Sequence, residues 1–572
     1  MKRWLFFVLA ILVPLVMVAN DAKLAPDLKQ AAGNNTVSVI VQYKTVPEDV
    51  HKNHVRSLGG AIGRELRTVK ALAAQVPASA LAALSDDDSV AYVSVDRPIR
   101  SHLNNASAAV LANYAWGVGL DGSGIGVAVV DSGIHLVDDL RKAPAQSRIK
   151  LSQDFTGAGS ADDGYGHGTH VAGIIAGNAF DSTCANCVVA IRGIAPNVNL
   201  INLRALDANG QGSDSTVIAA IEAAIQFKDQ YNIRVLNLSL GRPVWESYRL
   251  DPVCQAVEQA WNAGIVVVVS AGNDGRDNSM GSNGYGTIES PGNDPYVITV
   301  GAMNTKRTPD RGDDVMTSYS SKGPTLLDAI VKPDLVAPGN RVISLETPGT
   351  LLQNHPENRP LTSYYKQGVV GTPSPAYFTL SGTSMATGVV SGAAALMLQQ
   401  DPTLTPDQVK ARLMKTAYKN LPPYTTVVDG GTSYVIQSDG FTVGAGYLDV
   451  QAALSNTERA PGVAKSPAAQ YDPLTGNVYF VADPTAPWGL SAMWGASLVW
   501  GGNIFTGESG NSAMWGSSAM WGDSAMWGDS AMWGDSAMWG DSAMWGDSAM
   551  WGNSAMWGNS AMWGSLTITG EN

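Results

Sequence analysis

Between residues 108 and 456 the chain repeats one pattern, in which a short aliphatic run is followed by a stretch with helical spacing. The runs lack polar alternation, which is typical of strands buried on both faces of a parallel sheet. We therefore predict a doubly wound α/β domain with a mainly parallel sheet, whose ligands bind at the carboxyl ends of the strands. The expected strands are 124–131, 197–206, 233–241, 264–273 and 294–302, and the expected helices are 170–180, 215–227 and 251–264.

A smaller unit precedes this domain. Residues 36–43 read as a strand, 46–58 as a helix, 64–77 as a strand, 78–87 as a helix and 89–99 as a last strand. This alternation predicts an independent α+β unit of the ferredoxin-like kind. The polar stretch around Asn104 and Asn105 is suited to a linker.

The N-terminus carries an export pattern. Lys2 and Arg3 form a basic start, and Leu5 to Ala19 is an uncharged apolar run. Fifteen apolar residues are short for a membrane span, so residues 1–22 are predicted to be a signal peptide. We expect a secreted or cell-envelope protein; an uncleaved anchor is the alternative, because Met17 stands where a cleavage site prefers a small residue.

Charge and cysteine content limit the partners and cofactors. The net charge of −13 does not favour binding to nucleic acid, because phosphates attract Lys and Arg. Cys184 and Cys187 form a CxxC pair, but no second pair and no clustered histidines complete a zinc site, so we predict no metal. Export makes a disulfide plausible; whether Cys184 pairs with Cys187, or Cys254 takes part, stays open.

Polar residues follow three of the expected strands. Asp131 ends VAVVD, Gly241 ends LNLSLG and Asn273 ends VVVVSAGN. GYGHGTHVAG supplies His167 between two glycines, and LSGTSMATGVVSG supplies Ser384 among small residues. A hydroxyl becomes a nucleophile when an imidazole takes its proton and a carboxylate fixes the tautomer of that imidazole.

Asp131, His167 and Ser384 could fill these three catalytic roles. The side-chain amide of Asn273 and the backbone N–H of Ser384 at a helix start could stabilise the oxyanion. Small neighbours would leave room for a peptide backbone above the serine.

At this point the chain resembles the subtilisin-like serine peptidases. The resemblance rests on DSG at 131–133, GHGTHVAG at 166–173, SAGN at 270–273 and GTSMATG at 382–388. The chain order Asp, His, Ser is that of subtilisin, and KPDLVAPG at 332–339 and GAGYLDV at 444–450 also look like family segments. The resemblance implies a serine endopeptidase domain at 105–456 that acts through an acyl-enzyme on polypeptide substrates. It also implies that residues 23–104 (core 36–100) are an inhibitory propeptide, removed during maturation of an autoprocessed zymogen.

The resemblance further implies two segments that bracket an extended peptide substrate by backbone hydrogen bonds. The positions that match are Gly210, Gln211, Gly212, Ser239, Leu240 and Gly241. Glu289 falls near the floor of the first specificity pocket, where the family often has glycine. Our hypothesis is that its carboxylate favours Lys or Arg before the cut bond; the alternative is that it points to solvent.

Two features depart from the family. Gly388 replaces the usual proline after GTSMAT, and we expect it to loosen the helix without loss of chemistry. The family often binds calcium, but the stretch after the His167 helix lacks a matching ligand loop, and Asp162 and Asp163 read as an exposed acidic loop. We therefore expect no required cofactor, and a structural calcium ion has no support from the residues.

The C-terminal part is a repeat. After a linker at 457–484, residues 485–572 contain SAMWGD hexads with a tryptophan every six residues. An even period keeps each residue type on one face of an extended chain. Three alternatives stay open: a stacked β-solenoid, an aromatic ladder that binds a cell surface or other macromolecules, and a low-complexity tail. The rival function for the whole chain is a surface-binding repeat protein with a degenerate peptidase domain.

Overall fold

The computed structural model describes residues 23–25, 28, 36–95, 105–143, 146–279, 281–472, 474, 477–481, 486, 562–564 and 570–571. The chain divides after Ser101 into two compact units, a small unit and a large unit, each treated by itself. The predicted signal peptide at 1–22 lies outside the described residues, as does most of the repeat tail. Among the helices that are described, none is long and apolar enough to cross a membrane.

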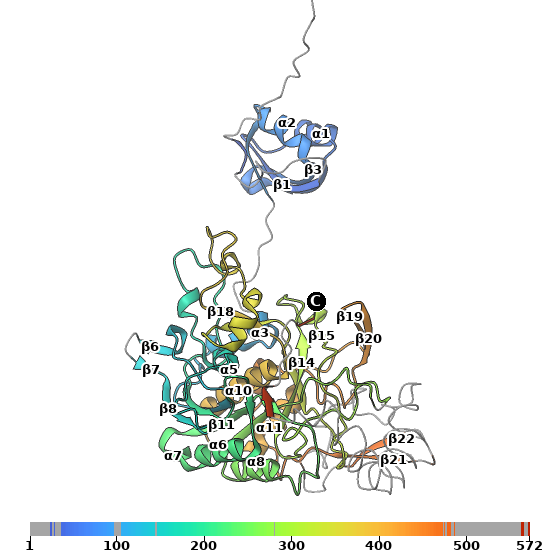
Figure 1. Ribbon diagram of the computed structural model, residues 1–572. Helices are drawn as coiled ribbons and strands as arrows, with labels where there is room; N and C mark the ends of the chain where they lie inside the picture. The colour runs from blue at the N-terminus through green and yellow to red at the C-terminus, as the bar shows by residue number, and fades with distance from the viewer. Residues whose placement is uncertain are drawn as a thin grey trace, which may run out of the picture. The chain divides into compact units, whose positions relative to one another are not determined.

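The small unit is a four-stranded antiparallel sheet with two helices (Figure 1). Val39 and Val41 of β1 and Leu72 of β3 pack against Val55 of α1 and Leu84 of α2 in a buried core. The strand order β2-β3-β1-β4 is that of a ferredoxin-like fold, as predicted. The elements are β1 Thr36–Tyr43, α1 Asp49–Ser57, β2 Ala61–Leu66, β3 Ala71–Pro77, α2 Leu81–Asp86 and β4 Val90–Val95.

One expectation for this unit was wrong. Residues 64–77 were expected as a single strand, but they belong to two strands, β2 and β3, which pair as a hairpin. The turn between them places Lys70 in the left-handed region at φ 51°. Since lysine does not signal such a turn, no break is expected at this position from the residues alone.

The large unit is built around an eight-stranded sheet in the order β15-β14-β13-β11-β5-β9-β8, with β16 paired to β14. Every pair in it is parallel except β14 with β15, which confirms the predicted mainly parallel α/β fold. Strands β5, β13 and β14 are buried at every position, as their unbroken aliphatic sequence predicts. The strands are β5 Gly126–Asp131, β8 Ile149–Asp154, β9 Asn199–Arg204, β11 Ile233–Leu238, β13 Val266–Ser270, β14 Ile298–Asn304, β15 Val315–Met316 and β16 Leu335–Pro338.

Helices cover both faces of this sheet. α5 (His167–Ala176) packs against α10 (Thr383–Gln400), and α6 (Asp214–Gln226) packs against α8 (Pro252–Asn262). In Figure 1 the α5–α10 pair and the α6–α8 pair lie on opposite sides of the sheet. The other helices are α3 Asn105–Ala109, α4 Ala112–Gly117, α7 Lys228–Tyr231, α9 Thr350–Asn354, α11 Pro406–Thr416 and α12 Val450–Ser455.

The large unit also contains several short sheets that are separate from the eight-stranded sheet. A three-stranded sheet has the order β10-β23-β12, formed by Gln211–Gly212, Met562–Gly564 and Leu240–Gly241. Within the segment expected as a linker, 457–484, Ala468–Asp472 pairs antiparallel with Asn477–Val481. The two-stranded pairs are β6 Arg141–Ala143 with β7 Gln146–Ser147, β17 Val342–Leu345 with β18 Tyr377–Leu380, β19 Tyr424–Asp429 with β20 Thr432–Gln437, and β21 Ala468–Asp472 with β22 Asn477–Val481.

Candidate active site

Asp131 and His167 form a buried pair at the carboxyl edge of the sheet. Asp131 is the last residue of β5, and its Oδ1 lies 2.7 Å from Nδ1 of His167. The same oxygen accepts a hydrogen bond from the backbone N–H of Ser132 at 2.7 Å. Both side chains are at most 1% exposed. The geometry fixes the imidazole so that Nδ1 donates to the carboxylate, which leaves Nε2 as the basic nitrogen.

Glycines allow the two residues to meet. His167 is the first residue of α5, after Gly166 at φ +107°. A Cβ on Gly168 would lie 2.2 Å from the carbonyl oxygen of Gly133 and 3.1 Å from Cβ of Asp131. Any side chain at Gly168 would therefore push α5 away from the end of β5. Nε2 of His167 is buried and has no hydrogen-bond partner among the described residues.

Asp163 holds the loop that leads into α5. Its Oδ1 accepts from Ser132 Oγ at 2.8 Å and from the backbone N–H of Gly166 at 2.7 Å, and its Oδ2 accepts from the N–H and Oγ1 of Thr169. Burial raises the pKa of Asp163, while the hydrogen bonds from Gly166 and Thr169 act in the opposite direction.

The expectation that both acidic residues of this loop are exposed was therefore wrong for Asp163, which is 2% exposed. Asp162 does lie at the surface, where it contacts His135. Aspartate side chains often accept hydrogen bonds from backbone N–H groups that follow them in a turn, and this tendency is the one local signal for Asp163.

A second histidine, His170, follows His167 by three residues in α5. His170 is fully buried, and its Nε2 donates to the carbonyl oxygens of Val342 and Phe378 at 3.2 and 3.1 Å. Desolvation lowers the pKa of His170 to about 3, with a smaller contribution from neighbouring His167. His170 is therefore neutral at physiological pH and joins α5 to the β17–β18 pair.

Ser384 is the second residue of α10 and is fully buried. Its Oγ donates to the carbonyl oxygen of Ser239 at 3.0 Å, and Ser239 Oγ donates to the carbonyl oxygen of Ser384 at 3.0 Å. Asn237 donates to Ser239 Oγ at 2.9 Å and accepts from Ser391 Oγ at 2.8 Å. This chain of hydrogen bonds fixes the start of α10 to the end of β11.

The small residues around Ser384 also allow α10 to pack closely on its neighbours. Gly388, which departs from the family pattern, is the sixth residue of α10 and lies beyond its first turn. A Cβ there would approach Ile174 of α5 to 3.2 Å. The glycine thus lets α10 pack closely on α5.

Asn273 lies beside the start of α10. Its Oδ1 accepts the backbone N–H of Thr383 at 3.0 Å, so the amide nitrogen Nδ2 must face the other way. Nδ2 is buried and has no partner among the described residues. A buried, unpaired donor is costly unless a ligand completes it.

The residues expected to bracket a substrate lie on two short strands. Gln211 and Gly212 form β10, and Leu240 and Gly241 form β12. Gly210 adopts φ +76°, and a Cβ there would meet the ring of Tyr165 at 2.5 Å. The side chain of Ser239 is buried against Ser384, so only its backbone is placed to serve a peptide.

Glu289 lies against the glycines that follow β11 and β13. A Cβ on Gly241 would meet Oε2 of Glu289 at 2.1 Å, and a Cβ on Gly272 would meet its Cδ at 2.8 Å. Burial and the nearby Asp277 raise the pKa of Asp274, and Glu289 acts on this pKa in the opposite direction. The side chain is partly buried and lies at the strand ends rather than on the outer surface.

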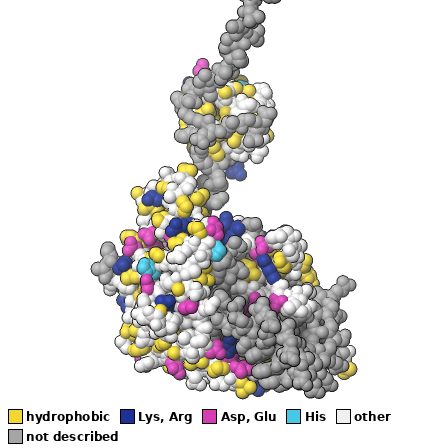
Figure 2. All heavy atoms as spheres, viewed as in Figure 1, with side chains coloured by type: hydrophobic (Ala, Val, Ile, Leu, Met, Phe, Trp, Pro, Cys, Tyr) yellow, Lys and Arg dark blue, Asp and Glu magenta, His cyan; other side chains and the backbone are white. Residues whose placement is uncertain are grey.

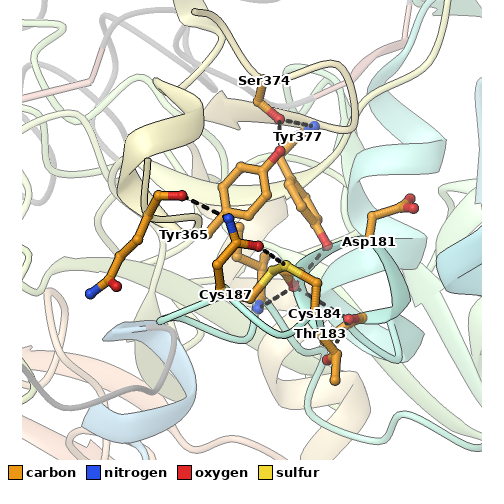
Figure 3. The surroundings of a disulfide bond; sticks show 12 residues. Asp181, Thr183, Cys184, Cys187, Tyr365, Ser374 and Tyr377 are labelled. Atoms are coloured by element: carbon orange, nitrogen blue, oxygen red, sulfur yellow. Dashed lines mark hydrogen bonds between the residues drawn. A yellow bond between two sulfur atoms is a disulfide. The ribbon is translucent and has the colours of Figure 1, made fainter. Parts of the chain in front are cut away.

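The cysteine alternatives are resolved. Cys184 and Cys187 form a disulfide, and Cys254 is a buried free thiol whose pKa is raised by burial. Figure 3 shows Tyr365 and Tyr377 beside the disulfide, with Ser374 hydrogen-bonded to both. Tyr377, in β18, also donates to Ser182 Oγ at 2.9 Å, so the segment that leads into the disulfide loop is packed against β18.

In the part of the chain that the structure describes, no group of three or more His, Cys, Asp or Glu residues could hold a metal ion. On the face of the large unit shown in Figure 2, Lys and Arg side chains are scattered among Asp and Glu.

Comparison with known proteins agrees with this geometry. The model of the subtilase family matches residues 122–446. The chain is 36% identical over 394 residues to serine protease AprX of Bacillus subtilis (strain 168), covering 66% of this chain and 82% of that protein. It is 35% identical over 396 residues to the extracellular serine proteinase of Thermus sp. (strain Rt41A), covering 66% and 78%. Subtilisin E of Bacillus subtilis (strain 168) is 30% identical over 462 residues, covering 79% and 98%.

Fold, site and relatives thus define a serine peptidase of the subtilisin type. The chain belongs to the subtilase family and is a subtilisin-like serine endopeptidase that acts on polypeptides.

Proposed function

We propose that this protein is a secreted endopeptidase in which Ser384 attacks the peptide carbonyl and His167 acts as general base. Asp131 holds the imidazole in the correct tautomer and stabilises the imidazolium that forms. The observation that carries the proposal is the buried 2.7 Å pair of Asp131 and His167, with Nε2 of His167 left unpartnered among the described residues. A buried base without a partner is suited to accept a proton.

In this mechanism the Ser384 hydroxyl turns from the Ser239 carbonyl towards Nε2 and gives up its proton as Oγ bonds to the substrate carbon. Asn273 Nδ2 and the N–H of Ser384 stabilise the oxyanion. The imidazolium then protonates the leaving amine, and water hydrolyses the acyl-enzyme by the same route in reverse. No metal or cofactor takes part in these steps, and we propose no calcium site.

We also propose that Glu289 sets a preference for Lys or Arg before the cut bond. Support comes from its position against Gly241 and Gly272, at the ends of the strands. A carboxylate at this position would attract a basic side chain of the substrate.

The protein is proposed to be made as a zymogen. The ferredoxin-like small unit, within 23–104, would act as an intramolecular inhibitor and folding aid that the enzyme removes. Export is supported by the apolar run Leu5 to Ala19 and by a relative that is an extracellular proteinase. The repeat tail is a candidate for binding a cell surface or other macromolecules.

Mass spectrometry of both termini of the secreted protein tests the proposal. The wild type should lack residues 1–104 and hydrolyse a denatured protein substrate, whereas Ser384→Ala should retain residues 23–104 and be inactive. The rival reading, a degenerate peptidase with a binding tail, requires that wild type and Ser384→Ala have the same N-terminus and no activity.

A further inference from the structure

The extreme C-terminal part of the chain lies in the groove between the two strands expected to bind substrate. β23 (Met562–Gly564) runs antiparallel to both β10 and β12 and is the dark red arrow across the large unit in Figure 1. Gly212 pairs with Met562, Gln211 and Gly241 pair with Trp563, and Leu240 pairs with Gly564. An extended substrate would add to β10 and β12 through the same backbone groups.

This strand pairing lies close to Ser384, the proposed nucleophile. Gly564 is paired with Leu240, and the adjacent residue, Ser239, accepts the hydrogen bond from Ser384 Oγ at 3.0 Å. A peptide strand at this position is therefore one residue from the group that holds the nucleophile. The pairing uses backbone atoms, as would the addition of any extended peptide to β10 and β12.

A second, independent contact fixes the end of the chain. Oε1 of Glu571 accepts a hydrogen bond from Arg276 Nη2 at 2.8 Å and from the backbone N–H of Ser318 at 2.9 Å, and it also contacts Ser318 Oγ. The backbone of Glu571 exchanges two hydrogen bonds with the amide of Asn340, at 2.7 and 2.8 Å. Glu571 is 1% exposed, which is rare for a glutamate unless it is paired.

The Glu571 contacts also lie near the nucleophile. Gly570 has φ +67°, and a Cβ there would meet Ser381 Oγ at 2.1 Å and Asn340 Oδ1 at 2.7 Å. Ser381 precedes Ser384 by three residues, and Asn340 follows Gly339, which accepts the N–H of Gly382 at 2.9 Å. The two described pieces of the C-terminal end therefore contact the large unit next to Ser239 and next to Ser381.

We propose that Met562–Gly564 and Gly570–Glu571 act as an autoinhibitory strap, in which Met562–Gly564 occupies the substrate position between β10 and β12 and Gly570–Glu571 forms an anchor. The strap competes with peptide substrates as a tethered, substrate-like strand, and its tether gives it a high effective concentration. The inference rests on the proposed peptidase function. It gives the end of the tail a role that the hexad composition does not predict.

Steady-state kinetics on a soluble peptide substrate test the strap. Two mature enzymes are compared: one with its C-terminus intact by mass, and one ending at Ala561. Removal of residues 562–572 should lower KM about tenfold or more and leave kcat within about twofold, as expected for loss of a competitive occupant. An unchanged KM would overturn the proposal. If neither protein cuts peptide or reacts with a fluorophosphonate, the proposed function itself fails, which is a distinguishable result.

The substitution Glu571→Gln tests the anchor by itself. It weakens the contacts to Arg276 and Ser318 and should lower KM part of the way towards the truncated value. Glu508→Gln, which removes the same charge from the same tail, is the matched control and should leave KM unchanged. Equal effects of the two substitutions would contradict a specific anchor at Glu571.

An added synthetic peptide tests the strap even if truncation disturbs the fold. The 560–572 peptide, SAMWGSLTITGEN, should inhibit the truncated enzyme competitively. The 542–554 peptide, SAMWGDSAMWGNS, has the same length and the same strand residues but lacks the anchor, and should inhibit more weakly. Rapid hydrolysis of the 560–572 peptide without inhibition would make this segment a processing site and overturn the strap.

Discussion

The backbone N–H of Thr383 donates a 3.0 Å hydrogen bond to Oδ1 of Asn273, one residue before Ser384. This bond settles which way the amide of Asn273 faces, since only its oxygen can accept. The nitrogen is left buried and without a partner among the described residues. The donor proposed for the oxyanion is thus oriented by the same helix start that carries the nucleophile.

Replacement of Asn273 separates these two roles. Asn273→Ala should lower kcat about 10²- to 10³-fold with little change in KM, because one oxyanion donor is lost. Asn273→Asp keeps an oxygen for Thr383 but removes the donor, so it should be at least as damaging. Recovery of kcat in Asn273→Asp, measured on a peptide anilide, would show that the amide only positions Thr383.

Ser239 should matter for stability. Ser239→Ala removes the hydrogen bond to the Ser384 carbonyl and leaves Nδ2 of Asn237 without its acceptor, which costs about 1–3 kcal/mol of unfolding free energy. Urea unfolding in a Ser384→Ala background, which prevents self-digestion, measures this. Ser215→Ala, at an exposed position of α6, is the control and should stay within about 0.5 kcal/mol. Equal stability of both variants would contradict the network.

Glu289 gives a prediction about specificity. Glu289→Gln and Glu289→Gly should reduce cleavage after Lys and Arg at least about tenfold relative to cleavage after apolar residues, since a buried charge pair is lost. Cleavage-site profiling with a peptide library measures the ratio, and the rates on apolar sites serve as the internal control. The same preference in the wild type and both variants would end the hypothesis.

The burial of neutral His170 predicts that the folded protein loses stability in acid. Its pKa falls from 6.5 to about 3 on folding, so the unfolded chain binds a proton between these values and the folded chain does not. Stability is then lost as the pH falls through this window, by about 2 kcal/mol between pH 6.5 and 5. In a Ser384→Ala background, His170→Gln should flatten the dependence of unfolding free energy on pH. An unchanged slope in His170→Gln would assign the acid sensitivity to other groups.

Much of the large unit could be predicted from sequence because its strands are buried on both faces. The unbroken aliphatic runs ending at Asp131 and Ser270 have one structural interpretation, and the carboxyl ends of parallel strands meet at one edge. Sequence reasoning also proposed which residues would meet there. It missed β8, since Ile149–Asp154 alternates polar and apolar residues at the sheet edge.

The misses have physical causes. The hairpin turn at Lys70 uses a residue that does not favour the left-handed region, so no turn signal was present. The burial of Asp163 follows from partners supplied by Ser132, Gly166 and Thr169, which no local pattern reveals in full. The strand at Met562–Gly564 depends on pairing with residues more than three hundred positions earlier, and its sequence is the same in every hexad.

The most direct test of the central claim is the rate at which a fluorophosphonate modifies Ser384, with the adduct located by peptide mass spectrometry. The wild type should carry the adduct on Ser384 alone. The modification rate in His167→Ala should fall by about 10³-fold or more, because the base that activates the hydroxyl is gone. An adduct on another residue, or an equal rate in His167→Ala, would contradict the proposal that His167 activates Ser384.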